Sequence, residues 1–237
     1  MIPFRTVSGR NDAAFVFADH ASNHVPDWVG DLGVTEADMA RHIAWDIGSE
    51  AVARGLCERL DCAGLVCGFS RLVIDANRDP DAPGVIPEES DGTDIPGNRG
   101  LSVVERAERT ERLYDAYHAA LGDALDARPD CLALSVHSFT PQLTGQPPRR
   151  TDIGLLVKDD SETAVAFITA MREIAPDLLV DVNEPYSAHD LNHTVDHNVV
   201  PRGLRHLAIE LRQDHIATDA MAVTMADTLA RAIRPLL

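Results

Sequence analysis

The sequence has almost no lysine, since Lys158 is the single lysine among 21 basic residues and the rest are arginines. A phosphate-binding P-loop requires Gly-Lys-Ser/Thr, which does not occur here, and a Schiff-base lysine would have to be Lys158, which lies beside two aspartates. The Gly-x-Gly-x-x-Gly turn of dinucleotide-binding proteins and the Gly-x-Ser-x-Gly elbow of serine hydrolases are also missing. These absences argue against lysine-dependent cofactors, dinucleotide binding and serine nucleophiles.

Basic residues are also outnumbered by acidic ones: 21 basic and 38 acidic residues give the 237-residue chain a formal net charge of −17. This balance argues against partners with a phosphate backbone and against anionic membrane surfaces. No apolar run reaches the ~18 residues of a membrane span, and the N-terminus lacks a basic and apolar leader, so we expect a cytoplasmic protein. The four cysteines lack zinc-knuckle spacing and are expected to be buried apolar residues.

Short apolar segments alternate with helical patterns along the chain. The expected strands are residues 13–19, 64–76 (one strand with a break, or two strands), 131–138, 152–157, 178–183 and 206–212. The expected helices are residues 35–60, 102–127, 161–174 and 219–233. Continuous apolar character predicts strands that are buried on both faces. We therefore predict an α/β fold in which residues 1–237 form a single three-layer domain, with a mixed, mostly parallel sheet flanked by helices. Residues 79–100 and 140–151 read as long loops.

Polar residues follow the expected strands, where open α/β sheets bind ligands. They are His20, the pair Asn77 and Arg78, the pair His137 and Ser138, Tyr186, and the pair Glu210 and Arg212. Since these strand ends meet at one edge of the predicted sheet, the pattern predicts a site there.

Two histidines at strand ends, His20 and His137, are either packed core imidazoles or ligands of a catalytic zinc. A catalytic zinc site uses three protein ligands and keeps one position open. Asn23, His24 and Asp46 are the candidates for the third ligand. Asp46 is equally a candidate for orienting a ligand imidazole from behind.

Glu210 interrupts an apolar strand, where a carboxylate is costly unless it is paired. We expect it to act as a general base, with an ion pair to Arg212 as the alternative. Arg71, Asn77 and Arg78 are expected to bind a substrate carboxylate, because a guanidinium matches a carboxylate with two donors. Ion pairs to nearby aspartates are the alternative for these arginines.

His189, His193 and His197 are spaced by four residues, which would align them on a helix as a rival metal site. Loop-forming residues surround them, and we instead expect a loop in which His197 or His193 contacts the substrate.

Six segments together resemble the N-formylglutamate amidohydrolase family. They are HASNHVP at 20–26, HIAWDIG at 42–48, SRLVIDANRDP at 70–80, VHSFTP at 136–141, NEPYS at 183–187 and IELRQD at 209–214. The resemblance implies a fold similar to zinc carboxypeptidases. By position it implies metal binding by His20, Asn23 and His137, substrate contacts by Arg71, Asn77, Arg78 and Tyr186, and a base at Glu210. Asn23 departs from the wider superfamily, which has Glu at that position.

The sequence thus predicts a metal-dependent hydrolase of an N-acyl amino acid, most simply N-formyl-L-glutamate giving formate and L-glutamate. The expected metal is Zn²⁺ or another divalent ion, the partner a small anionic substrate, and the state a monomer or homodimer. Ser138 is expected to touch the substrate, and Arg212 to orient Glu210 or meet a second carboxylate. The alternatives are a zinc carboxypeptidase or other deacylase, a metal-free small-anion binding protein, and a structural or partner-binding role.

Overall fold

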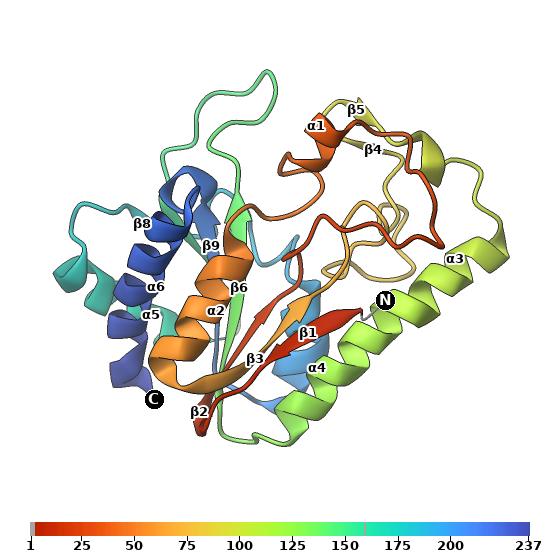
Figure 1. Ribbon diagram of the computed structural model, residues 1–237. Helices are drawn as coiled ribbons and strands as arrows, with labels where there is room; N and C mark the ends of the chain where they lie inside the picture. The colour runs from red at the N-terminus through yellow and green to blue at the C-terminus, as the bar shows by residue number, and fades with distance from the viewer. Residues whose placement is uncertain (1–2, 159) are drawn as a thin grey trace.

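A seven-stranded sheet forms the middle layer of the computed structural model, which describes residues 3–158 and 160–237 (Figure 1). The strand order is β1-β3-β2-β6-β9-β7-β8. The four strands β3, β2, β6 and β9 are parallel, whereas β1 and the pair β7–β8 run in the opposite direction. The strands are β1 Phe4–Val7, β2 Asn11–Ala18, β3 Cys62–Cys67, β6 Leu132–Phe139, β7 Ile153–Leu156, β8 Val180–Val182 and β9 His206–Arg212. The mixed, mostly parallel sheet predicted from the sequence is confirmed.

Helices cover both faces of the sheet, as expected for strands that are apolar throughout (Figure 1). On one face lie α2 (Ser49–Leu60), α5 (Ser161–Ile174) and α6 (Asp219–Ile233), whose apolar residues share a core with β2, β6 and β9. On the other face lies a long helix that begins as α3 (Val103–Arg109), continues through the π-helical turn Thr110–Asp115 and ends as α4 (Ala116–Asp126). The three-layer prediction is therefore also confirmed.

The caps explain why two of these helices begin where the sequence predicted. Asp160 accepts a hydrogen bond from Thr163 N before α5, and Thr218 accepts one from Met221 N before α6. A second π-helical turn, Val195–Val199, and short 3-10 turns at Pro96–Asn98, Val200–Arg202, Gln213–His215 and Arg234–Leu236 complete the helical elements. Among the described residues, no helix is both long and apolar enough to cross a membrane.

The single helix expected over residues 35–60 is wrong. The chain forms the short helix α1 (Glu36–Met39), then turns through residues 40–48, and only then enters α2. Gly48 ends the turn with a φ of +83°, and a Cβ there would lie 2.5 Å from Ile216 O, so no other residue fits this backbone. As a result Asp46 lies in a turn rather than on a helix.

The second half of the strand expected over residues 64–76 is also wrong, because β3 ends at Cys67 and the chain continues in turns. The expected loop at 79–100 carries a small hairpin of β4 (Glu89–Ser90) and β5 (Thr93–Asp94). Asn98 is fully buried and ties this segment together: its Nδ2 donates to Leu72 O and Pro87 O, and its Oδ1 accepts from Arg109 Nη1.

Replacing Asn98 by alanine should destabilise the protein by about 3 kcal/mol. Two buried carbonyls and the Arg109 guanidinium would lose partners, and each unmade buried hydrogen bond costs about 1–3 kcal/mol. For a chain of this length the melting temperature should fall by roughly 10 °C, measurable by circular dichroism. Asn23→Ala is the matched control, because Asn23 is exposed and its side chain makes one hydrogen bond. Equal effects of the two variants would contradict the anchoring role.

After β8 the chain turns back and Glu184 passes close to Gly154 of β7. A Cβ on Gly154 would lie 2.2 Å from Glu184 O, so only glycine allows the chain to pass this closely. The carboxyl end of β8 faces away from those of β2, β6 and β9, since β7 and β8 run antiparallel to β9. Tyr186 is therefore positioned by the segment that follows β8 and passes Gly154, and not by the carboxyl end of β8 itself.

Candidate active site

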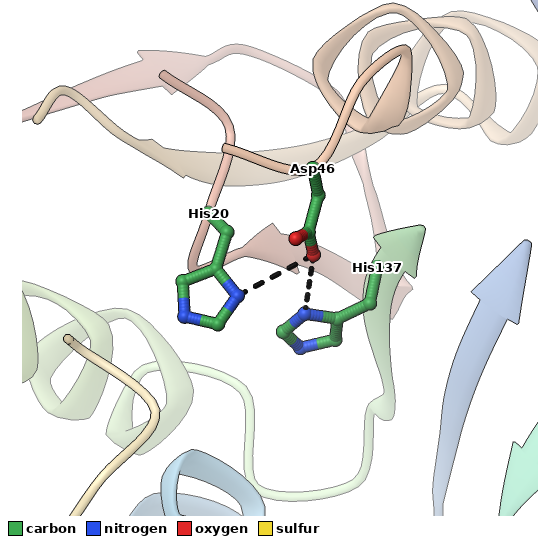
Figure 2. Close-up of side chains that lie close together, drawn as sticks. All are labelled: His20, Asp46 and His137. Atoms are coloured by element: carbon green, nitrogen blue, oxygen red, sulfur yellow. Dashed lines mark hydrogen bonds and ion pairs between the residues drawn. The ribbon is translucent and has the colours of Figure 1, made fainter. Parts of the chain in front are cut away.

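Two imidazoles and a carboxylate converge at the carboxyl edge of the central strands. His20, Asp46 and His137 are buried, and each offers one ligand atom within 4.8 Å of the others. Asp46 Oδ2 lies between the rings, 2.9 Å from His137 Nδ1 and 3.4 Å from His20 Nδ1 (Figure 2). The centroids of the two imidazole rings are 5.1 Å apart.

The sheet register brings these residues together. Strands β2 and β6 are parallel neighbours, so His20, just past β2, lies beside His137 near the end of β6. The turn before α2 is fixed to both strands, because Asp46 N donates to His20 O at 2.9 Å and Ser138 N donates to Asp46 Oδ2 at 3.2 Å. Glu210 is the direct partner of His137 in the pairing of β6 with β9.

Each imidazole also faces a carboxylate with its second nitrogen. His20 Nε2 is 2.7 Å from Asp75 Oδ1, and His137 Nε2 is 3.3 Å from Asp19 Oδ2. Tyr117 Oη in turn donates to Asp19 Oδ1 at 2.7 Å. Carboxylates in this position fix the tautomer and orientation of metal-binding histidines, so both Nδ1 atoms are left to face Asp46.

Burial and the neighbouring charges shift the pKa values of this cluster strongly. Burial opposes ionisation of Asp75, but the positive charges of Arg71 and His20 hold its pKa well below the usual range. Burial likewise opposes protonation of His137, but Asp19 and Asp46 raise its pKa well above the ordinary value. Burial raises the pKa of Glu210 to about 7, against the attraction of His137.

The donor set fits a divalent metal. The buried aspartates Asp19, Asp46 and Asp75 surround two imidazoles, and imidazole nitrogens and carboxylate oxygens are common ligands of zinc in proteins. Within the described part of the chain, His20 Nδ1 and Glu210 Oε2 have no hydrogen-bond partner. Two ligands of a tetrahedral zinc lie about 3.3 Å apart, close to the separations measured around Asp46.

A cavity of about 180 Å³ lies over this cluster. It is lined by most of the residues predicted for the site, which are His20, Asp46, Arg71, Asn77, Arg78, His137, Ser138, Tyr186 and Glu210. A second cavity of about 620 Å³ shares His42, Arg71, Asp75, Arg78 and Tyr186 with it. Strand β4, the turn residue Asp91 and the segment before β4 form much of the outer wall.

Four predicted site residues, Asn23, His24, His197 and Arg212, lie outside the cavity lining. Asn23 and His24 are exposed and do not line the cavity, and Asn23 Nδ2 donates to Met39 O. Arg212 makes ion pairs with Asp152 and Asp214 and lies outside the cavity lining, so it is not free to orient Glu210. Of the three candidates for a third ligand, Asn23, His24 and Asp46, the structure groups Asp46 with His20 and His137.

His197 belongs to a separate histidine cluster. Its ring stacks on that of His193, and both pack against His118 on the helix α4. The expected loop is wrong here, since His197 lies in the π-helical turn Val195–Val199. His193 Nε2 is 2.6 Å from Tyr114 Oη, and His118 is hydrogen-bonded through both ring nitrogens, so this group is a packing arrangement.

Three residues at the site escaped sequence reasoning. His42 lines both cavities, and Asp19 and Asp75 lie behind the two imidazoles. The dipeptide Asp19-His20 after a buried strand was a usable signal for Asp19. Nothing local indicates that Asp75 reaches His20, because 55 residues separate them.

A model of the N-formylglutamate amidohydrolase family matches residues 13–217. Among solved structures, gene product Atu2144 from Agrobacterium tumefaciens is 33% identical, with a TM-score of 0.91 over 99% of this chain and 96% of that chain. An N-formylglutamate amidohydrolase from Ralstonia eutropha JMP134 is 22% identical, with a TM-score of 0.71 over 99% and 97% of the two chains. A putative carboxypeptidase A from Shewanella denitrificans OS-217 is more distant, at 13% identity and a TM-score of 0.47 over 98% and 60%. No curated protein matches the chain.

Proposed function

Because the chain belongs to the N-formylglutamate amidohydrolase family and is an amidohydrolase, we propose that it is a metal-dependent enzyme that hydrolyses N-acyl amino acids. The simplest substrate is N-formyl-L-glutamate, which gives formate and L-glutamate. The observation that carries the proposal is the buried donor set of His20, Asp46 and His137, with Glu210 paired beside His137. Incubation of the purified protein with N-formyl-L-glutamate, with formate and free amine quantified, tests it.

His20 and His137 would hold the metal through their Nδ1 atoms and Asp46 through its carboxylate, and we propose zinc as the ion. A divalent ion at this position supplies a Lewis acid for the scissile carbonyl and makes water more acidic. Asp75 and Asp19 orient the two imidazoles from behind. Arg71 contacts both Asp46 and Asp75 and thereby holds a positive charge at the wall of the cavity.

Glu210 is proposed as the general base and acid. Its carboxylate takes a proton from the attacking water and returns it to the nitrogen of the leaving amine, which completes cleavage of the amide bond. The position suits this role because Glu210 is buried and its Oε2 has no partner among the described residues. The raised pKa caused by burial makes this carboxylate a stronger base than an exposed glutamate.

Asn77 and Arg78 are proposed to bind the carboxylate of the amino acid, with Ser138 and Tyr186 as further walls of the same cavity. Thr194 N donates to Asn77 Oδ1, which directs the Asn77 amide, while Arg78 Nε contacts Asp75 Oδ2 at 3.3 Å and leaves other donors available. Holding the carboxylate there would place the scissile bond near Glu210.

Arg78→Ala should raise KM for N-formyl-L-glutamate by about ten- to hundred-fold, because a hydrogen bond between charged groups contributes about 1.5–3 kcal/mol. For an amide substrate whose carboxylates are blocked as amides, KM should change little. Steady-state kinetics on both substrates provide the measurement. Arg99→Ala serves as the control, since Arg99 pairs with Asp94 and lines neither cavity. Equal losses on both substrates would indicate a purely structural arginine.

The outer cavity favours a second candidate function, that of a deacylase or carboxypeptidase acting on a larger anionic substrate. Its volume of about 620 Å³ exceeds that of the inner cavity and adds room beyond a formyl group. Rates with N-formyl-, N-acetyl- and N-succinyl-L-glutamate and with short peptides would separate the two. A preference for N-formyl-L-glutamate would favour the first function, and a preference for succinyl or peptide substrates the second.

A further inference from the structure

The cations already assigned to the cavity wall are matched by carboxylates. Arg71 contacts Asp46 and Asp75, and Arg78 contacts Asp75 as well. Arg212, which the sequence suggested for a second carboxylate, is held by Asp152 and Asp214. If the remaining donors of Arg78 take the first carboxylate of a substrate, a second carboxylate needs a cationic group other than these.

Arg149 is such a group at the end of the loop 140–151. Its Nη1 donates to Thr140 O at 3.0 Å, and its Cζ lies 4.7 Å from the Tyr186 ring centroid and 5.5 Å from that of Phe139. Thr140, Tyr186 and Phe139 all line the inner cavity, and Arg149 packs against them from outside the lining of both cavities. Within the described ranges 3–158 and 160–237, no ion pair joins the Arg149 side chain to a carboxylate.

The contacts of Arg149 leave most of its donors available. A guanidinium has five N–H groups, and stacking on an aromatic ring leaves the in-plane donors open to an anion. Its charge also reaches His42 in the cavity wall: burial lowers the pKa of His42, Asp91 opposes this, and the charges of Arg41, Arg71 and lastly Arg149 lower the pKa further. The loop is held at its base by a backbone hydrogen bond from Arg149 N to Pro141 O at 2.8 Å.

We propose that Arg149, supported by the ring of Tyr186, forms a subsite for the second carboxylate of a dicarboxylic N-acyl amino acid. The inference rests on the proposed function, in which Asn77 and Arg78 take the first carboxylate. In this proposal Arg149 is the residue that makes the enzyme prefer substrates with an acidic side chain over substrates with a neutral one. A role limited to supporting Tyr186 would affect all substrates alike.

The kinetic test compares N-formyl-L-glutamate with its neutral isostere N-formyl-L-glutamine. Arg149→Met keeps the length and the apolar packing on Tyr186 but removes the charge, so kcat/KM for the glutamate substrate should fall about 10- to 100-fold, mainly through KM. The value for the glutamine substrate should stay within about threefold. Arg149→Lys, which keeps the charge without the planar fork, should give an intermediate loss. Arg150→Met is the matched control, because Arg150 is the exposed neighbour in the same loop.

A binding test does not depend on turnover. Calorimetric titration should show that glutarate binds at least tenfold more tightly than butyrate, which lacks the second carboxylate, and that Arg149→Met removes the difference. Equal losses on both formyl substrates, or an unchanged glutarate preference in Arg149→Met, would overturn the subsite. If Arg149-dependent glutarate binding persists in a protein that hydrolyses no N-acyl amino acid, the subsite stands and the proposed function fails.

Discussion

Glu210→Gln should lower kcat for N-formyl-L-glutamate by about 10²- to 10⁴-fold, the range that general acid–base catalysis contributes. The amide has nearly the shape of the carboxylate but takes up no proton from water. The fold should tolerate the change, because burial already disfavours the charged form of Glu210 and no hydrogen bond to its Oε2 is lost among the described residues. Steady-state kinetics, metal content and a melting curve give the three measurements.

The pattern expected for Glu210→Gln is a lost rate with the metal and the melting temperature retained. Glu89→Gln is the matched control, because Glu89 is exposed on the hairpin strand β4 and belongs to the outer cavity wall only. Unchanged turnover in Glu210→Gln would refute the base assignment. Loss of the metal together with the rate would instead indicate that Glu210 serves the metal site.

Removal of the metal should abolish hydrolysis, and addition of Zn²⁺ to the chelated protein should restore it. Without the ion the reaction lacks the Lewis acid that contributes several kcal/mol to stabilising the transition state. Elemental analysis of the purified protein should find about one divalent ion per chain. Asp46→Asn should lower both metal content and rate, because Asp46 supplies the one carboxylate of the donor set.

Asp227→Asn is the control for Asp46→Asn, since Asp227 is an exposed aspartate that pairs with Arg59 and lines neither cavity. Hydrolysis that survives complete chelation would make the metal-dependent mechanism wrong. A chain that holds no metal, hydrolyses nothing and still binds small dicarboxylates would support the alternative of a metal-free anion-binding protein.

The sequence predicted regular elements well where side-chain pattern alone decides them. Helices α5 and α6 have the predicted bounds, because a capping residue marks the start of each and an apolar stripe runs along it. The strands β6 and β9 were recognisable as apolar runs that are buried on both faces. The pattern gave the wrong result over residues 35–60, because the helical spacing of apolar residues continues through a turn that depends on Gly48, which lies against Ile216.

The candidate site was predictable to the extent that its residues follow strands. His20 and His137 could be paired from the sequence because each lies near the end of a buried strand, although their role in binding a metal stays a prediction. Asp46 and Asp75 could not be placed in this way, since both lie in turns whose course depends on contacts with distant segments.

By itself, the sequence determined the class of fold and the chemical types available at one edge of the sheet, because hydrophobic periodicity and strand ends are local properties. The tertiary structure alone decided which carboxylate joins the two imidazoles, that Arg212 is occupied elsewhere and that Arg149 packs against Tyr186. The physical reason is that buried charges must find partners across the whole fold, and those partners are chosen by three-dimensional packing and not by position along the chain.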